Sequence, residues 1–475
     1  MTANKILIAC DTFAPDHNGT ATFSKNLAVT LQKRGFEVHV IAPATSKLYG
    51  TFREKHDDVP IVVHRLKSYR LPFQPAQRFV NPARLTRRLD GLLKVIRPDV
   101  VHIQSHINIG HHAALAAVKN QIRLVATSHI DAQSLVENAI LAPRFVKNFL
   151  TNLLLKDAAR VFKAADVISA PTKRAAQLLE GAVNELRVLP ISGGVDIDLF
   201  NTLAEPVQSA RKLLYVGRLD REKHVYVLLE AIAKLPKSFQ VSLEIVGTGS
   251  QASELSKLAS ELQIQDQVKF AGEVSDGELL AKLGESSVFV MPSIQELQSM
   301  ATLEAMAAGR PVLAANAMAL PHLVHDGDNG FLFKPDSPID LANKIQAIFS
   351  MSENDFHSLS QGSRVLAESH DLAGTVDVYE RIYKGLPVED TTLDNDPEYE
   401  SPISSTRRFA NFVRRSSKSI ERGANGVIER LDIARGSVIE TFSEVRFSIE
   451  RRGRKATKKI SNSLRRILKS LSKDD

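Results

Sequence analysis

Residues 293–312 read SIQELQSMATLEAMAAGRPV, and this stretch organises the second half of the chain. An apolar strand at 288–291 leads into it, and a helix-forming segment lies within it at 300–308. Glu296 therefore falls on the loop between strand and helix, and Glu304 lies about two turns further on. The N–H groups that open such a helix attract phosphate, and carboxylates accept hydrogen bonds from hydroxyls. The spacing predicts a sugar-nucleotide site, and two solvated glutamates are the simpler interpretation.

Outward from this stretch, short apolar strands alternate with helical segments. The alternation predicts parallel sheets with helices on both faces and a ligand crevice beyond the carboxyl ends of the strands. In the first half, the predicted elements lie at 5–9, 22–34, 37–42, 61–65, 83–96, 100–103, 112–119, 124–127 and 167–170. In the second half, they lie at 212–216, 225–233, 241–246, 251–262, 268–271, 279–283, 288–291, 300–308, 312–314 and 339–350.

Length and composition are those of a globular protein. The 475 residues suffice for two domains plus an extension, and the apolar content of 43% is ordinary. Cys10 is the one cysteine, so no internal disulfide can form, and its apolar neighbours predict a buried, inert thiol that suits a reducing compartment. No run of about 18 apolar residues is present, and the first ten residues lack a signal-peptide pattern. We therefore expect no membrane span.

The net charge of +7 is concentrated at the end of the chain. Residues 401–475 hold 19 Lys and Arg against 8 Asp and Glu, whereas the first 400 residues hold 42 against 46. Residues 389–400 contain six acids and no base, which predicts a disordered linker. Apolar residues then recur at helical spacing among cations, most sharply at 460–471, as in a helix that lies on a membrane surface. A protein partner is the alternative, and nucleic acid fits least because few aromatics are present for base stacking.

Two cations follow the first strand of the second series. Residues 216–224 read VGRLDREKH, and Gly217 permits close backbone approach at the strand end. Arg218 and Lys223 then stand beside the predicted crevice. A pair of cations can neutralise a leaving diphosphate as its charge develops. A solvated basic loop is the alternative.

Taken together, these segments resemble the retaining glycosyltransferases of family 4, which have the GT-B fold. The resemblance rests on the E-x7-E pattern of Glu296 and Glu304, on Gly-Arg-x4-Lys at 217–223, and on MALPHLV at 318–324 with DGDNGFLF at 326–333. It covers about residues 5–385. It implies an α/β fold of two Rossmann-like, doubly wound domains that face a cleft, here followed by a basic helical C-terminal extension.

The resemblance assigns roles to the charged residues. Arg218 and Lys223 would hold the diphosphate, Glu304 the ribose, and Glu296 the hydroxyls of the transferred sugar. Many family members carry Glu-Gly-Phe-Gly where this chain has ELQS at 296–299, and that variant looks like the branch that glycosylates lipids such as diacylglycerol. In this fold the leaving phosphate is expected to help take the acceptor proton, so the two-carboxylate scheme of glycoside hydrolases does not apply.

The remaining site predictions concern backbone N–H groups, a histidine and a glycine. The N–H groups around Ser299 and Met300 would touch phosphate because they open a helix. The resemblance places a functional histidine at His129, where it would hydrogen-bond the donor sugar, and it implies that Gly19 approaches phosphate or acceptor. Structural roles are the alternative for both. Four further histidines are expected to line the acceptor side rather than to bind zinc: His102, His106, His111 and His112.

The predicted organisation has five parts. They are an acceptor-side domain at 1–205, a nucleotide-sugar-binding domain at 206–370, a helix that crosses back to the first domain at 371–388, an acidic linker at 389–400 and a basic amphipathic tail at 401–475.

The predicted function is the retaining transfer of a hexose from UDP- or GDP-hexose to a membrane-associated lipid or glycolipid acceptor. No cofactor or resident metal is required, and Mg²⁺ is at most a non-essential accessory. An anionic membrane surface would be contacted through 401–475 and through a basic segment at 65–88, which places the protein in the cytoplasm at the inner face of the membrane. The alternatives are a soluble family-4-type enzyme with a small-molecule or glycan acceptor, and a non-catalytic membrane adaptor that keeps the fold.

Overall fold

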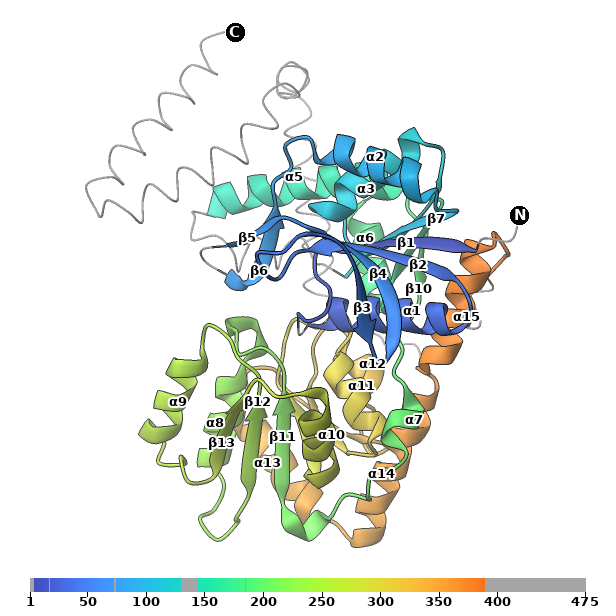
Figure 1. The fold of residues 1–475 in the computed structure, drawn as a ribbon. Coiled ribbons are helices and arrows are strands. Elements are labelled where there is room, and N and C mark those ends of the chain that lie inside the picture. The colour runs from blue at the N-terminus through green and yellow to red at the C-terminus, as the bar shows by residue number, and fades with distance from the viewer. Residues whose placement is uncertain (1–3, 17, 72–73, 130–143, 184, 389–475) are drawn as a thin grey trace, which may run out of the picture. The chain divides into compact units, whose positions relative to one another are not determined.

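Two sheets, each flanked by helices, form the framework of the protein (Figure 1). The computed structural model describes residues 4–16, 18–71, 74–129, 144–183 and 185–388. The first sheet with its helices is called the first lobe, and the second sheet with its helices the second lobe; both belong to one compact unit. The predicted pair of Rossmann-like α/β lobes is confirmed. The predicted linker and tail at 389–475 lie outside the described residues.

The first sheet has eight strands in the order β10-β9-β8-β7-β1-β2-β4-β3. Its strands are β1 (Lys5–Ala9), β2 (Glu37–Pro43), β3 (Gly50–His56), β4 (Val59–Leu66), β7 (Val100–Ile103), β8 (Arg123–Thr127), β9 (Val167–Ala170) and β10 (Val188–Pro190). Its helices are α1 (Gly19–Lys33), α2 (Leu85–Ile96), α3 (Ile109–Lys119), α5 (Arg144–Lys163) and α6 (Lys173–Ala182). Cys10 follows β1 and is fully buried, so the prediction of a buried thiol is confirmed.

The second sheet has six parallel strands in the order β13-β12-β11-β14-β15-β16. They are β11 (Lys212–Val216), β12 (Ser242–Val246), β13 (Val268–Gly272), β14 (Val288–Met291), β15 (Val312–Ala315) and β16 (Gly330–Phe333). The helices are α7 (Ile197–Phe200), α8 (Val225–Ala233), α9 (Ala252–Glu261), α10 (Asp276–Glu285), α11 (Met300–Ala307), α12 (Leu320–Leu323), α13 (Pro338–Ser350) and α14 (Glu353–Glu368), with short 3₁₀ turns at Gln208–Ala210 and Arg221–Lys223.

Each sheet has one point where the strand order reverses. In the first sheet, β1 lies between β2 and β7, and in the second, β11 lies between β12 and β14. Ligands of doubly wound sheets bind beyond the carboxyl ends of the strands at such a point. The loop that leads into α1, the loop after β11 and the loop after β14 all start there. The first loop leads to Gly19, the first residue of α1, and the other two carry the two cations and Glu296, respectively.

One edge of the first sheet departs from the parallel pairing that the sequence predicts. β3 pairs with β4 antiparallel, through a turn at Asp57 and Asp58 with φ of 49° and 62°. Two positive φ angles are typical of tight hairpin turns. β3 is rich in charged residues and sits at the sheet edge, so it lacks the apolar run that marks a strand. A separate antiparallel ribbon of β5 (Ser68–Leu71) and β6 (Gln74–Val80) also went unpredicted.

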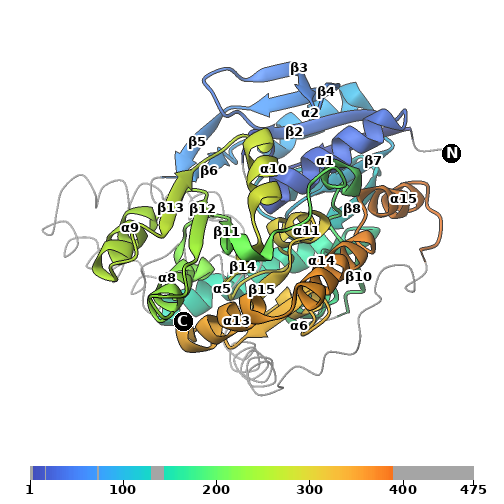
Figure 2. The same cartoon turned by 90° about the horizontal axis from the view of Figure 1, so that it is seen from below.

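The last described helix, α15 (Leu372–Tyr383), packs on the first lobe although it follows the second lobe in sequence. It lies beside α1 (Figures 1 and 2). Arg34, just after α1, donates to Asp377 at 2.5 Å and to Glu380 at 2.8 Å. Tyr379 and Tyr383 are buried against the sheet of the first lobe. The apolar core of the first lobe is therefore built from both ends of the described chain.

Candidate functional site

The loop after β11 is held by backbone packing against the loop after β12. The Leu219 N–H donates to the Thr248 carbonyl at 2.9 Å. A Cβ at Gly247 would lie 2.0 Å from the Gly217 carbonyl oxygen, and one at Gly249 would lie 2.4 Å from the backbone carbon of Leu219. No side chain fits at such distances, so glycine is required where the two loops meet. The packing fixes the loop that carries both predicted cations.

Both of these cations are paired with carboxylates. Lys223 Nζ lies 2.6 Å from Glu296 Oε1, and the two side chains are 15% and 10% exposed. Arg218 donates to Glu222 Oε1 at 2.7 Å and also contacts Asp220. The structure thus brings Lys223 and Glu296 together from the ends of adjacent strands, and it places Arg218 on the same loop with acidic partners of its own. A diphosphate that binds here can replace these carboxylates as the ion-pair partner of Lys223 and Arg218.

The start of α11 supplies a second element suited to an anion. Ser299 is the N-cap, and its Oγ accepts from the Thr302 N–H at 3.4 Å and from the Thr302 hydroxyl at 2.8 Å. The N–H groups of Met300 and Ala301 have no partner within the helix, as in every helical first turn. They lie a few residues from Glu296 along the chain. The predicted phosphate-binding backbone is therefore close in sequence to the predicted sugar-binding carboxylate.

Glu304 occupies a partly buried position on α11. Burial, reinforced by the nearby charge of Asp276, raises the pKa of Glu304 to about 7, and Lys25 opposes this rise. Lys25 belongs to α1 of the first lobe and lies 3.3 Å from Asp57 and 3.7 Å from Asp276 of the second lobe. Glu304 thus sits where charged groups of the two lobes meet.

The first-lobe predictions fall close to the second-lobe loop. A Cβ at Gly19 would lie 3.6 Å from Met300 Cγ, so the start of α1 and the start of α11 are neighbours. His129 lies partly buried beyond β8, with its Nε2 at 3.0 Å from Gln104 Oε1 and its ring centroid 5.0 Å from that of Phe23. Burial lowers the pKa of His129 to about 4, so the ring is neutral at pH 7.

Three side chains at this junction escaped prediction: Phe23, Lys25 and Gln298. Phe23 and Lys25 lie on α1, and they read as ordinary helix residues in the sequence. Gln298 lies two residues after Glu296, and its amide reaches the first lobe at Gly193 and Ser192. The departure of ELQS from Glu-Gly-Phe-Gly was the one available signal for Gln298.

Two sequence expectations need correction. His102 does not line the acceptor side, because it is fully buried and its ring nitrogens lie 2.7 Å from Tyr383 Oη and from Thr127 Oγ1. Within the segment 65–88, Arg65 is buried and donates to Glu54 at 2.8 Å and 2.5 Å, so it is a structural residue. Among the described residues, no group of His, Cys, Asp or Glu is arranged to hold a metal ion.

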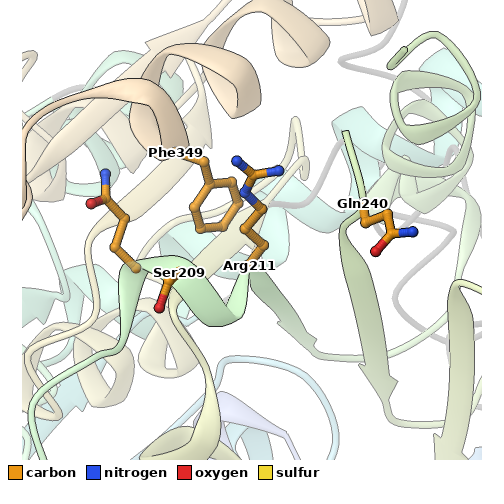
Figure 3. Close-up of a pocket in the computed structure, with 5 residues that line it drawn as sticks. Ser209, Arg211, Gln240 and Phe349 are labelled. Carbon is orange, nitrogen blue, oxygen red and sulfur yellow. The ribbon is translucent and has the colours of Figure 1, made fainter. Parts of the chain in front are cut away.

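A small pocket elsewhere is distinct from this site (Figure 3). Arg211 and Gln240 line it, and they lie just before β11 and β12. It therefore sits at the amino ends of these strands, opposite the edge at which doubly wound sheets bind ligands. We assign it no part in the chemistry.

Two Rossmann-like lobes with cations, carboxylates and a helix start at their strand ends define a glycosyltransferase of the GT-B class. The chain belongs to glycosyltransferase family 4: residues 17–199 match the family described as Glycosyltransferase Family 4, and residues 204–364 match Glycosyl transferases group 1. The family membership that the sequence motifs predicted is therefore confirmed.

The similar proteins include glycolipid synthases and glycosyltransferases with other acceptors. The chain is 24% identical over 379 residues to an alpha-monoglucosyldiacylglycerol synthase of Streptococcus pneumoniae, covering 75% of this chain and 81% of the relative. It is 28% identical over 402 residues to a D-inositol 3-phosphate glycosyltransferase of Streptomyces bingchenggensis, covering 78% and 86%. The structure of Anabaena HepE in complex with UDP-glucose shares the fold, with a TM-score of 0.62 at 19% identity over 80% of this chain and all of that one.

Among the residues that the structure describes, no helix combines the length and apolar character needed to span a bilayer.

Proposed function

We propose that this glycosyltransferase moves a hexose from UDP- or GDP-hexose, with retention of configuration, to a lipid or glycolipid acceptor at a membrane surface. The observation that carries the proposal is the contact of Lys223 with Glu296 at 2.6 Å, beside the start of α11. This arrangement supplies a cation for a diphosphate and a carboxylate for sugar hydroxyls within one loop cluster. Helix N–H groups that can bind a phosphate follow directly in the chain.

In the proposed complex, Arg218, Lys223 and the first N–H groups of α11 hold the diphosphate. Their positive charge stabilises the leaving group as the bond from the sugar to the phosphate breaks. Glu304 accepts the ribose hydroxyls, and Glu296 accepts hydroxyls of the hexose. No cofactor is required, and Mg²⁺ is at most an accessory. The leaving phosphate oxygen takes the acceptor proton on the face from which it departs, which retains the anomeric configuration.

The first lobe supplies the other side of the sugar. His129 is neutral because burial lowers its pKa to about 4, so it acts as a hydrogen-bonding group for the hexose rather than as a cation. Gly19 leaves room for phosphate or acceptor beside Met300. Gly19 thus lies beside the start of α11, and His129 contacts Phe23 of the helix that Gly19 begins.

The proposed membrane acceptor is supported by two relatives of this chain. Both are named alpha-monoglucosyldiacylglycerol synthase, and they come from Streptococcus pneumoniae and Acholeplasma laidlawii. The ribbon and helix at 65–88 also present exposed cations, together with a half-exposed Tyr69. These exposed cations are Lys67, Arg70, Arg84, Arg87 and Arg88. We propose that they and the tail at 401–475 place the enzyme on the inner face of the cytoplasmic membrane.

An assay of donor turnover tests the proposal. Purified protein is incubated with UDP- and GDP-hexoses, with and without vesicles that contain diacylglycerol or a monoglycosyl lipid, and release of nucleoside diphosphate is followed. We expect release that depends on one donor and one lipid, and an α-linked product by NMR from an α-linked donor. Absence of release with every donor and acceptor would favour a non-catalytic adaptor. Product of inverted configuration would exclude retention.

One alternative acceptor class has an observation in its favour. Several relatives at 27–29% identity are named D-inositol 3-phosphate glycosyltransferase, so a small phosphorylated polyol is a reasonable second candidate. Soluble acceptors of this kind, offered in detergent-free buffer, separate the two candidates. Turnover with the polyol phosphate that exceeds turnover with vesicles would replace the lipid proposal.

Neutralising the tail is expected to release the protein from anionic vesicles. Changing Lys458, Lys459, Arg465, Arg466 and Lys469 to Gln in the full chain removes five charges at about 1 kcal/mol each, so vesicle affinity should fall by up to about 5 × 10³-fold. Sedimentation with phosphatidylglycerol vesicles measures the change. The control neutralises five exposed lysines of the second lobe: Lys212, Lys234, Lys237, Lys257 and Lys269. Equal binding by parent and tail variant would show that the tail has no membrane role.

A further inference from the structure

The loop between β14 and α11, residues 292–299, carries Glu296 and is called the donor loop. Two of its successive residues, Leu297 and Gln298, contact the first lobe. The hydroxyl of Thr172 donates to the Leu297 carbonyl at 2.8 Å, and the same hydroxyl caps α6 by accepting from the Ala175 N–H at 3.1 Å. The Leu297 side chain packs against the apolar core of the first lobe. The loop that carries Glu296 is therefore attached to the first lobe as well as to its own sheet.

Gln298 adds a second and more specific attachment. Its Oε1 accepts from the Gly193 N–H at 2.7 Å, and its Nε2 donates to Ser192 Oγ at 2.9 Å. The Ser192 hydroxyl also lies 2.9 Å from His370 Nδ1. A Cβ at Gly193 would lie 2.8 Å from Gln298 Oε1 and 3.0 Å from Met300 Sδ, so the backbone passes close to both side chains. Both polar ends of the amide are used in one short cluster.

This cluster lies where the chain passes between the lobes. Just after Ser192 and Gly193, the Val195 N–H donates to the His370 carbonyl at 2.8 Å, and the Leu372 N–H donates to the Val195 carbonyl at 3.0 Å. The outward crossing after β10 and the return crossing before α15 are thus hydrogen-bonded to each other. Gln298 connects the donor loop directly to this paired crossing.

We propose that Gln298 is a positioning residue that fixes the donor loop relative to the first lobe. The inference rests on the proposed function and deepens it. Glu296 and the start of α11 hold the donor, whereas Gly19 and His129 belong to the first lobe, so transfer requires a defined distance between the two sets. The Gln298 amide sets that distance through Gly193 and Ser192, without a substrate contact of its own. This role accounts for a long polar side chain where many family members have Phe.

Steady-state kinetics give the first test. Gln298→Met keeps the length of the side chain and removes both polar groups, and Gln298→Ala serves as a second variant in case the first misfolds. We expect kcat to fall by about 10- to 100-fold, because small displacements of reacting groups carry large rate penalties. The Kd of UDP or GDP should stay within about 3-fold, because the residues proposed to hold the nucleotide, Arg218, Lys223 and Glu304, lie on the second lobe. A loss of nucleotide affinity as large as the loss of kcat would overturn the proposal.

A double-mutant cycle tests the route of the effect. If Gln298 acts through Ser192, the combination of Ser192→Ala with Gln298→Ala should be about as slow as Gln298→Ala alone. Additive losses would show that the two residues act separately and would contradict the proposed route. Gln240→Ala is the matched control, since Gln240 is exposed at the opposite end of the sheet and should retain the parent kcat.

A physical readout separates this inference from the proposed function. Cys10 is the one cysteine and is fully buried, so spin labels can be directed to Val95→Cys in the first lobe and Lys257→Cys in the second, both highly exposed. In the full-length protein, Gln298→Met should broaden the distance distribution between the labels, and Gln240→Ala should not. An unchanged distribution would overturn the positioning role. If the parent releases no nucleotide with any donor, the proposed function fails, while the label distances still decide the role of Gln298.

Discussion

Replacement of Lys223 by alanine is expected to lower kcat by about 10²- to 10³-fold, the usual effect of removing one group that stabilises developing charge. The ammonium group lies 2.6 Å from Glu296 in a mostly buried pair, so it is held in place before the donor arrives. Its benefit should be larger when the diphosphate leaves than when the donor binds. We therefore expect the Kd for UDP or GDP to rise by less than about 10-fold. Stopped-flow nucleotide release and titration calorimetry measure the two quantities.

The design of this experiment must account for Glu296, the ion-pair partner of Lys223. Lys223→Ala leaves the Glu296 carboxylate mostly buried and unpaired, which destabilises proteins on its own account. The double variant Lys223→Ala with Glu296→Gln removes that penalty and should melt closer to the parent while staying slow. Lys234→Ala changes an exposed lysine of the same lobe and should behave as the parent. Equal losses in kcat and in nucleotide affinity would argue against a transition-state role for Lys223.

Glu304 should make donor affinity depend on pH. Because its pKa is raised to about 7, the side chain is mostly ionised at pH 8 and mostly protonated at pH 6. A carboxylate accepts ribose hydroxyls more strongly than a neutral acid does. Donor affinity of the parent should therefore fall by roughly 10-fold as the pH is lowered from 8 to 6, as expected when a group titrates across this range. Glu304→Ala should weaken donor binding by about 10- to 100-fold at pH 8, the range for a charged hydrogen bond.

Glu304→Gln supplies the control for this pH dependence. Its donor affinity should be nearly constant between pH 6 and pH 8. Stability should move in the opposite sense, because a carboxyl whose folded pKa lies above the ordinary value of 4.5 favours folding at low pH and loses that contribution as the pH rises towards 7. Glu304→Gln should thus melt at a higher temperature than the parent at pH 8. A variant with the same pH dependence of affinity as the parent would show that another group titrates.

The sequence was sufficient for those parts of the fold that periodicity controls. The strands at 5–9, 100–103, 167–170, 212–216 and 288–291 have the predicted bounds, because each is a short buried run between polar turns. The edge strand β3 was missed because its side chains are charged and exposed, which leaves no apolar signal. Boundaries of the five predicted parts remain predictions.

The candidate site residues also differ in how far the local sequence could predict them. Lys223 and Glu296 were predicted to belong to one site, and the structure brings them into contact because they follow adjacent strands of one sheet. Lys25 and Gln298 were not predicted, because their contacts with the other lobe depend on how the two lobes are packed. His102 was predicted to lie near the acceptor because it falls at the end of a strand. The structure instead buries it in the core of the first lobe.

The packing of α15 bears on how the protein is made. Val376, Tyr379 and Tyr383 complete a core whose buried members outside α15 come from residues 6–191. A ribosome delivers the N-terminal half first, and domains generally fold as they emerge. Here the first lobe lacks its last apolar layer until Tyr383, the final residue of α15, has been synthesised. During that interval the nascent chain exposes the apolar surface that α15 later covers. We therefore expect the N-terminal half to depend on chaperones during translation.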